Sequence, residues 1–290
     1  MRPREIAVVS GKGGTGKTTV TAMLARALSE RCVICDADVD APDLWILLKP
    51  VVQREDLFVG GHKAQVNTPP CDGCGLCSRH CRFKAITMTP SGAHVDPTAC
   101  EGCGVCSILC PKGAVELLRT KQGHVFESQT SFGPMFHAKL NPGGENSGRL
   151  VQILRERARK SAGELRKEWI LLDGPPGIAC PAISALTGAS LGLIITEPSK
   201  SGLHDLLRLL EVTRQLRVPS GVVINRWDLS QEGSNRIRQA CEDTGTPVLA
   251  EIPFQEEVVR DLSMGNIPSS IPQELVDQIL QGIQRITQGE

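Results

Sequence analysis

The sequence of 290 residues contains no tyrosine, and aromatic residues account for only 3% of it. Aromatic side chains form the platforms on which nucleic-acid bases stack, so recognition of that kind is not expected. Basic and acidic residues number 32 each, which gives a formal net charge of zero. A neutral chain has no global attraction to nucleic acid or to an anionic membrane. We therefore expect no nucleic-acid partner.

Long apolar runs are also missing from the sequence. No stretch approaches the roughly 20 residues of a membrane-spanning helix, so stable membrane insertion is not expected. Residues 1–5 lead directly into a predicted strand, without the apolar core of a signal peptide. We therefore expect a cytoplasmic protein. In that reducing compartment, thiols at metal-ligand spacing bind metal rather than form disulfides.

Cysteine, by contrast, is abundant, with 12 residues in the chain. Eight of them fall within residues 71–110, in two runs that share the spacing C-x2-C-x2-C-x3-C. Pro111 follows the second run, whereas Arg82 stands at the equivalent position after the first. The repeat predicts two copies of one small unit. Such a unit has so little apolar core that bound metal must supply much of its folding free energy.

This spacing resembles that of the bacterial two-cluster ferredoxins, in which the fourth cysteine of each run ligates the other cluster. The resemblance implies one [4Fe–4S] cluster held by Cys71, Cys74, Cys77 and Cys110, and a second held by Cys100, Cys103, Cys106 and Cys81. Structural zinc is the alternative, because paired C-x2-C motifs also bind zinc. Zinc sites use four ligands from two pairs, however, and not two quartets. We expect Arg82 to make the surroundings of the two clusters unequal.

A nucleotide motif precedes the cysteine runs. Residues 11–18 read GKGGTGKT and satisfy G-x4-G-K-[ST], between a predicted strand and a predicted helix. The glycines let backbone N–H groups surround phosphates, and the helix N-terminus adds positive potential. Lys17 is expected to reach the β- and γ-phosphates of ATP, and Thr18 to ligate Mg²⁺. The predicted ATP-binding residues of this loop are Gly11, Lys12, Gly13, Gly14, Thr15, Gly16, Lys17, Thr18 and Thr19.

Short apolar runs alternate with amphipathic ones along the rest of the chain. Strands are expected at 6–9, 32–35, 169–172, 193–196, 221–224 and 248–252, and helices at 18–29, 202–216, 233–242 and 273–287. This alternation predicts an α/β fold, with the doubly wound, mostly parallel sheet of a P-loop NTPase. The cysteine runs predict an inserted small α+β domain like a bacterial ferredoxin.

The insert is assigned to residues 67–114, and the ATPase domain to residues 1–66 and 115–290. Segments 51–67 and 114–145 contain many Gly, Pro and Asn residues, so we expect irregular arms on either side of the insert. The basic run 155–159 is expected to form a solvated helix face rather than a binding patch.

Lys12 makes the nucleotide loop more specific. The pattern K-G-G-x-G-K-T resembles the deviant Walker A motif of the MinD/ParA/Mrp superfamily, which includes the nitrogenase iron protein. The whole chain is similar to members of that superfamily with an inserted ferredoxin domain. The resemblance implies slow, partner-stimulated ATP hydrolysis, and a homodimer or a heterodimer with a similar ATPase. Lys12 would then cross the interface to the partner's nucleotide; the alternative is a solvated loop lysine.

The resemblance also assigns roles outside the loop. Asp36 and Asp38 correspond to switch I, where we assign Asp36 to Mg²⁺-bound water and Asp38 to the attacking water. Asp173 ends the apolar run 169–172, as in a Walker B motif, and Gly177 would sense the γ-phosphate. Asn225 would contact adenine, or else is a strand-end turn residue. Catalysis is thus expected from Lys12, Lys17, Asp36 and Asp38, and Mg²⁺ binding from Thr18, Asp36 and Asp173.

Three functions fit these motifs. The first is ATP hydrolysis that gates electron transfer between two [4Fe–4S] clusters and an unidentified redox partner protein. The second is an ATPase that carries or assembles iron–sulfur clusters, as Mrp-like proteins do, although this chain lacks their paired C-x-x-C near the C-terminus. The third is a positioning ATPase of the MinD type whose clusters sense redox state. We favour the first because eight ligands saturate two clusters, as an electron carrier requires.

Two further features have structural interpretations. Cys180 follows Asp173 closely and is either structural or able to approach its own copy in a dimer. The apolar residues of 275–286 recur at helical spacing between charges of both signs. We expect that helix to pack into the core rather than onto a membrane.

Overall fold

The fold is given by a computed structural model that describes residues 3–141 and 147–289. The chain divides into two compact units. The first unit comprises Met1–Asp56, Val125–Lys139 and Ser147–Glu290, and the second comprises Leu57–His124 and Leu140–Asn146. All residues predicted to bind nucleotide lie in the first unit, and both cysteine runs lie in the second. The two units are described separately.

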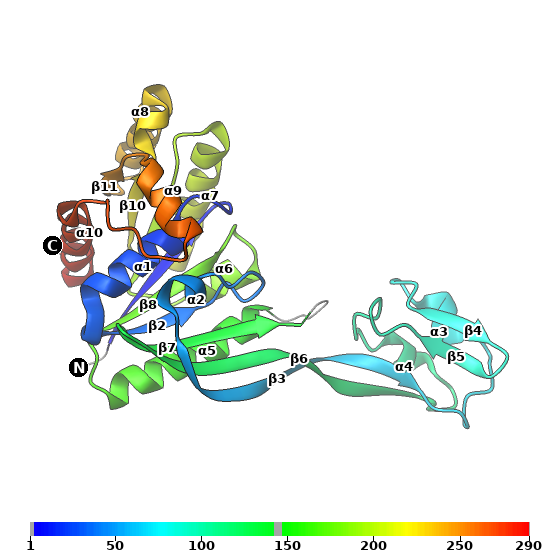
Figure 1. Ribbon diagram of the computed structural model, residues 1–290. Helices are drawn as coiled ribbons and strands as arrows, with labels where there is room; N and C mark the ends of the chain where they lie inside the picture. The colour runs from blue at the N-terminus through cyan, green and yellow to red at the C-terminus, as the bar shows by residue number, and fades with distance from the viewer. Residues whose placement is uncertain (1–2, 142–146, 290) are drawn as a thin grey trace. The chain divides into compact units, whose positions relative to one another are not determined.

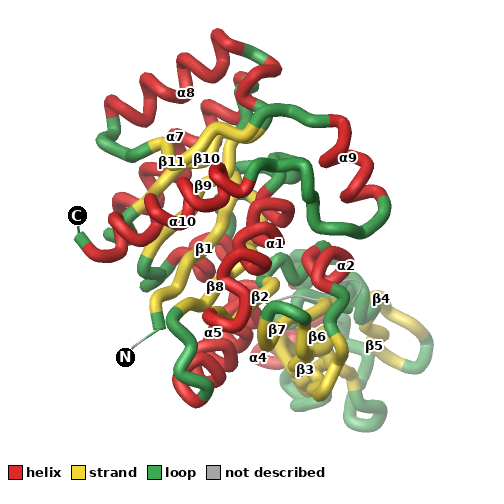
Figure 2. Tube along the Cα trace, turned by 60° about the vertical axis from the view of Figure 1, so that its left-hand side comes forward, coloured by secondary structure: helices red, strands yellow, loops and turns green. Residues whose placement is uncertain are grey.

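Nine strands of the described residues pair in one sheet, and some of them continue from the first unit into the second. The order of the sheet is β11-β10-β9-β1-β8-β2-β7-β6-β3 (Figure 2). The six strands at one end of this order are parallel to their neighbours. They are β1 (Arg4–Ser10), β2 (Cys32–Asp36), β8 (Trp169–Pro176), β9 (Leu191–Thr196), β10 (Ser220–Asn225) and β11 (Val248–Ile252). Each contains a predicted run, so the α/β fold with a mostly parallel sheet is confirmed.

Helices cover both faces of this sheet (Figure 1). On one face α1 contacts α2 and α10, and the other carries a series in which α5, α6, α7 and α8 touch in turn. Val276, Ile279 and Ile283 of α10 are buried in the core, so the prediction for the C-terminal helix is confirmed. The helices are α1 (Lys17–Leu28), α2 (Leu44–Leu48), α5 (Ser147–Glu164), α6 (Cys180–Leu186), α7 (Lys200–Leu216), α8 (Gln231–Asp243), α9 (Glu256–Ser263) and α10 (Gln273–Gln288).

The prediction of irregular arms was wrong. Residues 51–66 form β3 (Val51–Val66), and residues 115–140 form the hairpin of β6 (Val115–Thr130) and β7 (Gly133–Leu140). β6 lies between β3 and β7 in the sheet. Thr120 Oγ1 donates to Gly60 O at 3.2 Å across the β6–β3 pair. Cross-strand pairing therefore overrides the glycines that suggested irregular backbone.

The prediction of a solvated basic face on α5 was also wrong in part. Arg155 is 4% exposed, and its Nε donates to Glu5 Oε1 at 2.5 Å. Its guanidinium also donates to the carbonyl oxygens of Ser184 and Thr187. Arg159 binds the other Glu5 oxygen at 2.6 Å. The run therefore fixes α5 to β1 and α6, because a buried carboxylate requires paired cations.

The second unit contains four short elements between β3 and β6. They are α3 (Leu76–His80), β4 (Ile86–Thr89), β5 (Gly92–Val95) and α4 (Val105–Leu109). β4 and β5 pair antiparallel, with Ile86 opposite Val95. One core cluster of this unit consists of the buried residues Ala64, Ala85, Cys100 and Val115, with partly buried neighbours that include Cys81, Cys106 and Cys110.

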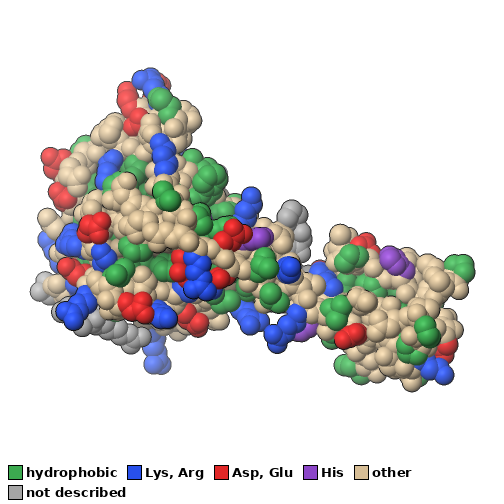
Figure 3. Space-filling model, turned by 60° about the horizontal axis from the view of Figure 1, so that its bottom comes forward, with side chains coloured by type: hydrophobic (Ala, Val, Ile, Leu, Met, Phe, Trp, Pro, Cys, Tyr) green, Lys and Arg blue, Asp and Glu red, His purple; other side chains and the backbone are tan. Residues whose placement is uncertain are grey.

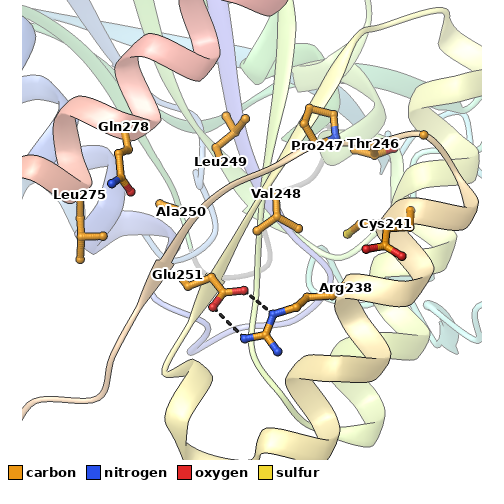
Figure 4. A pocket seen from close by; sticks show the side chains of 12 residues that line it. Arg238, Cys241, Thr246, Pro247, Val248, Leu249, Ala250, Glu251, Leu275 and Gln278 are labelled. Atoms are coloured by element: carbon orange, nitrogen blue, oxygen red, sulfur yellow. Dashed lines mark hydrogen bonds and ion pairs between the residues drawn. The ribbon is translucent and has the colours of Figure 1, made fainter.

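The surface shows charges of both signs. In Figure 3, basic and acidic side chains lie among one another rather than in one large block, as the zero net charge would suggest. A groove of about 650 Å³ lies at the sheet edge formed by β11, between α8 and α10. There Arg238 of α8 forms two hydrogen bonds to Glu251 of β11 (Figure 4). None of the predicted site residues lines this groove.

Candidate functional site

The loop between β1 and α1 carries the phosphate-binding motif. Helix α1 begins behind Gly16, whose φ of 94° lies in the left-handed region. A Cβ at Gly16 would lie 2.2 Å from Asn225 Nδ2, so only glycine fits there. No side chain of the described part of the chain caps α1. The buried Thr15 hydroxyl likewise has no partner among the described residues, which fits a loop built to surround phosphate.

Asp173 of β8 connects this loop to the sheet. Its Oδ1 accepts hydrogen bonds from Lys17 Nζ at 2.9 Å and Thr21 Oγ1 at 3.0 Å. Its Oδ2 accepts one from Thr18 Oγ1 at 2.8 Å. Asp173 is 1% exposed, so these charge-assisted bonds act at low dielectric. The fold thus brings Lys17 and Thr18 of the nucleotide loop to Asp173, which was predicted from a separate motif.

Asp36 and Asp38 add two more carboxylates. The Asp36 carboxylate accepts from the backbone N–H groups of Asp38 at 3.2 Å and Leu44 at 3.3 Å. Burial, reinforced by the charge of Asp173, raises the pKa of Asp36 well above its usual value. Burial is also the main cause that raises the pKa of Asp38 to about 6.

These carboxylates surround a single buried cation. Asp38 Oδ2 lies 3.6 Å from Lys17 Nζ. Burial acts to lower the pKa of Lys17, but Asp173, Asp38 and Asp36 together raise it above its usual value. Three carboxylates around one lysine leave surplus negative charge, which a divalent cation would neutralise.

Lys12 is held by residues that follow β9. Its Nζ lies 2.7 Å from Glu197 Oε1, 3.1 Å from Ser199 Oγ and 2.9 Å from Ser201 Oγ. Glu197 also pairs with Arg226 at 3.2 Å. Lys12 is therefore not a freely solvated loop lysine in this structure, although 31% of its side chain remains exposed.

Asn225, at the end of β10, contacts the loop from the other side. Its Nδ2 donates to Thr15 O at 2.8 Å. It also lines a narrow cavity together with Thr19, Pro253, Phe254 and other residues of 252–271. Gly177 is placed close to β1, because its N–H donates to Ser10 O at 2.8 Å.

The two cysteine runs share one local geometry, as the sequence repeat predicts. Gly75 and Gly104, with φ of 72° and 81°, precede α3 and α4. Ala85 N donates to Cys81 Sγ at 3.4 Å, and Ala114 N donates to Cys110 Sγ at 3.3 Å. The hydroxyls of Ser78 and Ser107 donate to the equivalent carbonyls, Ile86 O at 2.7 Å and Val115 O at 3.0 Å. N–H groups directed at sulfur stabilise thiolate ligands.

A cavity in the second unit brings together cysteines of both runs. Its walls include Cys81 of the first run and Cys100, Cys103 and Cys106 of the second. The remaining lining is mostly apolar and includes Phe83. These four thiols are the set that the ferredoxin resemblance assigns to one cluster. Soft thiolates in an apolar, enclosed cavity are the donor set that iron–sulfur clusters use, so the residues fit the group.

The other predicted set comprises Cys71, Cys74 and Cys77 of the first run and Cys110 of the second. Cys71 and Cys74 are close enough to raise the pKa of Cys77, for which burial is the main cause. Lys112, two residues after Cys110, pairs with Asp72 at 3.9 Å. The ion pair brings the turn after Cys110 to the loop of the first run.

No three His, Cys, Asp or Glu side chains within 3–141 and 147–289 converge closely enough to hold one metal ion. Neither the predicted Mg²⁺ ion nor the predicted [4Fe–4S] clusters require such convergence. Mg²⁺ in nucleotide sites keeps bound waters and takes few protein ligands besides the phosphates. The thiolates of a [4Fe–4S] cluster each bind a different iron, so they surround a volume rather than a point.

The remaining four cysteines belong to neither predicted cluster set. Cys32, Cys35 and Cys241 are buried in the first unit, and burial is the main cause that raises their thiol pKa values. Cys180 is exposed at the start of α6, against Gly148 of α5. None of the helices in the described part of the chain is long and apolar enough to cross a bilayer.

The sequence did not reveal the roles of Glu197 and Thr21. Glu197 lies 185 residues from Lys12, and no spacing rule links them. The link comes from topology, because β9 lies beside β1 and their carboxyl ends meet. Thr21 lies one turn after Lys17 on α1 and has the spacing of a second contact to Asp173. That spacing could have identified it.

Comparison with known proteins gives a family match over most of the chain. Residues 6–268 match the CobQ/CobB/MinD/ParA nucleotide binding domain. An uncharacterized protein of Methanocaldococcus jannaschii is 33% identical over 256 residues, which covers 88% of this chain and 86% of that protein. The iron–sulfur cluster carrier protein of Deinococcus radiodurans is 26% identical over 307 residues, covering 98% of this chain and 69% of that protein.

Solved structures agree on the fold. The cell division ATPase MinD of Pyrococcus furiosus aligns with a TM-score of 0.58 and 21% identity, over 99% of this chain and 100% of that one. A chain of the MinC:MinD cell division protein complex of Aquifex aeolicus aligns with a TM-score of 0.56 and 17% identity, over 97% of this chain and 96% of that one. At these identities the likeness establishes a MinD-like P-loop fold and no more.

Proposed function

This chain belongs to the CobQ/CobB/MinD/ParA family of nucleotide-binding domains, and from that premise we propose that it is an ATPase that couples nucleotide turnover to electron transfer through two [4Fe–4S] clusters. The observation that carries the cluster part is the cavity lined by Cys81, Cys100, Cys103 and Cys106. The observation that carries the ATPase part is the joint contact of Lys17, Thr18 and Thr21 with Asp173.

ATP hydrolysis follows from what these side chains do at the phosphates. Lys17 neutralises charge on the β- and γ-phosphates, and Thr18 with Asp173 positions Mg²⁺. Asp36 is proposed to order Mg²⁺-bound water, and Asp38 to orient the attacking water. Lys12 is proposed to reach the nucleotide of a second subunit, either a copy of this chain or a similar ATPase. Hydrolysis by the chain alone would be slow, because Lys12 is held by its own Glu197.

The clusters would be held by the two cysteine sets named above, within residues 57–124. A [4Fe–4S] cluster supplies one-electron redox chemistry at low potential when bound. The chain's own residues hold, insulate and tune it: Ala64, Ala85 and Ala114 each direct an N–H group at a cysteine sulfur. The apolar lining keeps water away, which also tunes the reduction potential.

A strand pairing supports coupling between the two regions of chemistry. β6 begins just after the second cysteine run, and the hairpin returns as β7. β7 pairs in parallel with β2, so that Met135, Phe136 and His137 lie opposite Ile34, Cys35 and Asp36. Asp36 is the residue proposed to order Mg²⁺-bound water. A shift of β2 on nucleotide binding would therefore be transmitted to β7 and to β6, the strand that continues from the cysteine module.

Cluster delivery is the second candidate. It is favoured by the likeness to the iron–sulfur cluster carrier protein of Deinococcus radiodurans. The number of cysteines argues for retention of the clusters, however, because two sets of four ligands saturate two clusters. Cys103 is the exposed member of the cavity set.

Anaerobic purification followed by iron, sulfide and phosphate-release assays tests the proposal. We expect about eight irons and eight sulfides per chain, and phosphate release from MgATP. Four irons or fewer would overturn the two-cluster proposal. Transfer of iron and sulfide to an apo-ferredoxin, with bleaching of the donor's absorbance, would favour delivery over electron transfer.

A further inference from the structure

The two halves of the cysteine module share a backbone but differ in surface chemistry. Segment 79–84, which follows Cys77, reads RHCRFK, and the equivalent segment 108–113 reads ILCPKG. Arg79, Arg82 and Lys84 are exposed. At the matching places, the second copy has Ile108, which is 84% exposed, Pro111 and Gly113. One copy is therefore basic at the surface and the other largely apolar.

The charge on segment 79–84 is not neutralised within the unit. Among the described residues, no ion pair is recorded for Arg79, Arg82 or Lys84. In the other copy the single cation, Lys112, is paired with Asp72 at 3.9 Å. Exposed cations that lack an internal partner attract an anionic surface in solution, and this attraction weakens with salt.

The basic segment also borders the cysteine cavity. His80 and Phe83 line the cavity together with Cys81, Cys100, Cys103 and Cys106. Phe83 is nevertheless 41% exposed, so its ring spans the cavity wall and the surface. A partner seated on this segment would contact Phe83 and so reach a residue that lines the cavity.

We propose that segment 79–84 is a docking surface for an acidic electron-carrier protein, which contacts Phe83 and forms ion pairs with Arg79, Arg82 and Lys84. The inference rests on the proposed function, since it names the class of partner for the same cavity. A protein is favoured over nucleic acid because the basic segment is only six residues long and the chain has no net positive charge. An apolar ring at the centre with a charged rim is the usual anatomy of a protein interface.

The test measures binding rather than turnover. The probe is oxidised flavodoxin, a small acidic flavin protein, titrated by calorimetry into the full-length, cluster-loaded protein. We expect R79E/R82E to weaken binding by roughly tenfold at low ionic strength, with a loss of salt dependence. The matched control is R119E/K121E, which makes the same charge change elsewhere in the unit and should bind like the wild type.

Carbodiimide cross-linking locates the contact independently. Mass spectrometry should find Lys84 joined to a flavodoxin carboxylate, and cross-links only at Lys112 or Lys121 would overturn the proposal. Equal losses in both double variants, or tighter binding of a single-stranded DNA oligonucleotide than of flavodoxin, would overturn it as well. Iron and sulfide analysis of every sample separates the two ideas. Absence of clusters would defeat the proposed function, whereas clusters with unchanged binding in R79E/R82E would defeat only the docking surface.

Discussion

The nucleotide-binding loop and the cysteine module differ in what holds each in shape. The loop lies on a sheet with a large buried core, and Asp173 of that sheet accepts hydrogen bonds from three side chains of α1, the helix that the loop opens. The core cluster of the module is small, with four buried residues of which two are alanine and one is a cysteine. The chain's own packing therefore suffices to build the first region. The second depends on the group that its thiols bind, as small metal domains do.

Removing one cysteine of the cavity tests whether the module depends on its cluster. C81S should lose about half of the iron, because its set supplies one of two clusters. The module should also become sensitive to limited proteolysis, while the first unit stays resistant. Iron analysis and mass spectrometry of the digest measure both effects. C180S alters an exposed cysteine outside the module and should keep all the iron; full iron in C81S would refute the assignment.

The second test acts on the other region. K17A removes the buried ammonium that lies 2.9 Å from Asp173. We expect phosphate release from MgATP to fall by roughly 100-fold, the usual loss when a charge-stabilising donor is removed. Iron content should not change, because the module does not depend on the loop. K49A, which affects a lysine bonded to Asn266, serves as the control. Wild-type turnover in K17A would contradict the site.

A pH titration tests the burial of His137 in the β6–β7 strand pair, which connects the cysteine module to β2. Burial lowers the pKa of His137 to about 4, and its Nε2 is 2.9 Å from Ser128 Oγ. A histidine with a lowered folded pKa takes up a proton first in the unfolded chain, so stability is lost as pH falls from about 6.5 towards 4. Relative to H137N, the wild type should lose about 2 kcal/mol between pH 7.5 and pH 5 in urea unfolding. Parallel curves for both proteins would contradict a buried, neutral His137.

The smallest effect is expected at Lys12. E197Q removes the carboxylate that holds Lys12 within its own chain. If Lys12 crosses to a second subunit, ATP-dependent dimerisation should tighten by about two- to fivefold, since a partly exposed ion pair contributes about 1 kcal/mol or less. Sedimentation with and without MgATP measures the change. E211Q alters an exposed residue of α7 that pairs with Arg214, and should leave dimerisation unchanged. Weaker dimerisation in E197Q would contradict the idea.

The parallel sheet was predictable because each strand is a short apolar run. All six predicted strands and all four predicted helices are present. The prediction of loops was wrong at β3, β6 and β7. Glycines such as Gly60 suggested irregular backbone there, but cross-strand pairing keeps the backbone extended. It also misled at Arg155, whose burial depends on Glu5, a residue distant in the chain.

The candidate site was predictable where motifs are local. The loop 11–18 and the cysteine spacing depend on neighbours in the chain. Two other features depend on residues that only the fold brings together. They are the contact of Glu197 with Lys12 and the difference in ion pairing between the two copies of the module. Long-range contacts of this kind carry no spacing signal.

The most direct test of the central claim is an EPR-monitored redox titration of the reduced protein, with and without MgATP. The account predicts two [4Fe–4S] signals, at least one of which changes midpoint potential when MgATP is added, and no such change in K17A. Two clusters whose potentials are identical with and without MgATP would contradict coupling between the nucleotide site and the cysteine module.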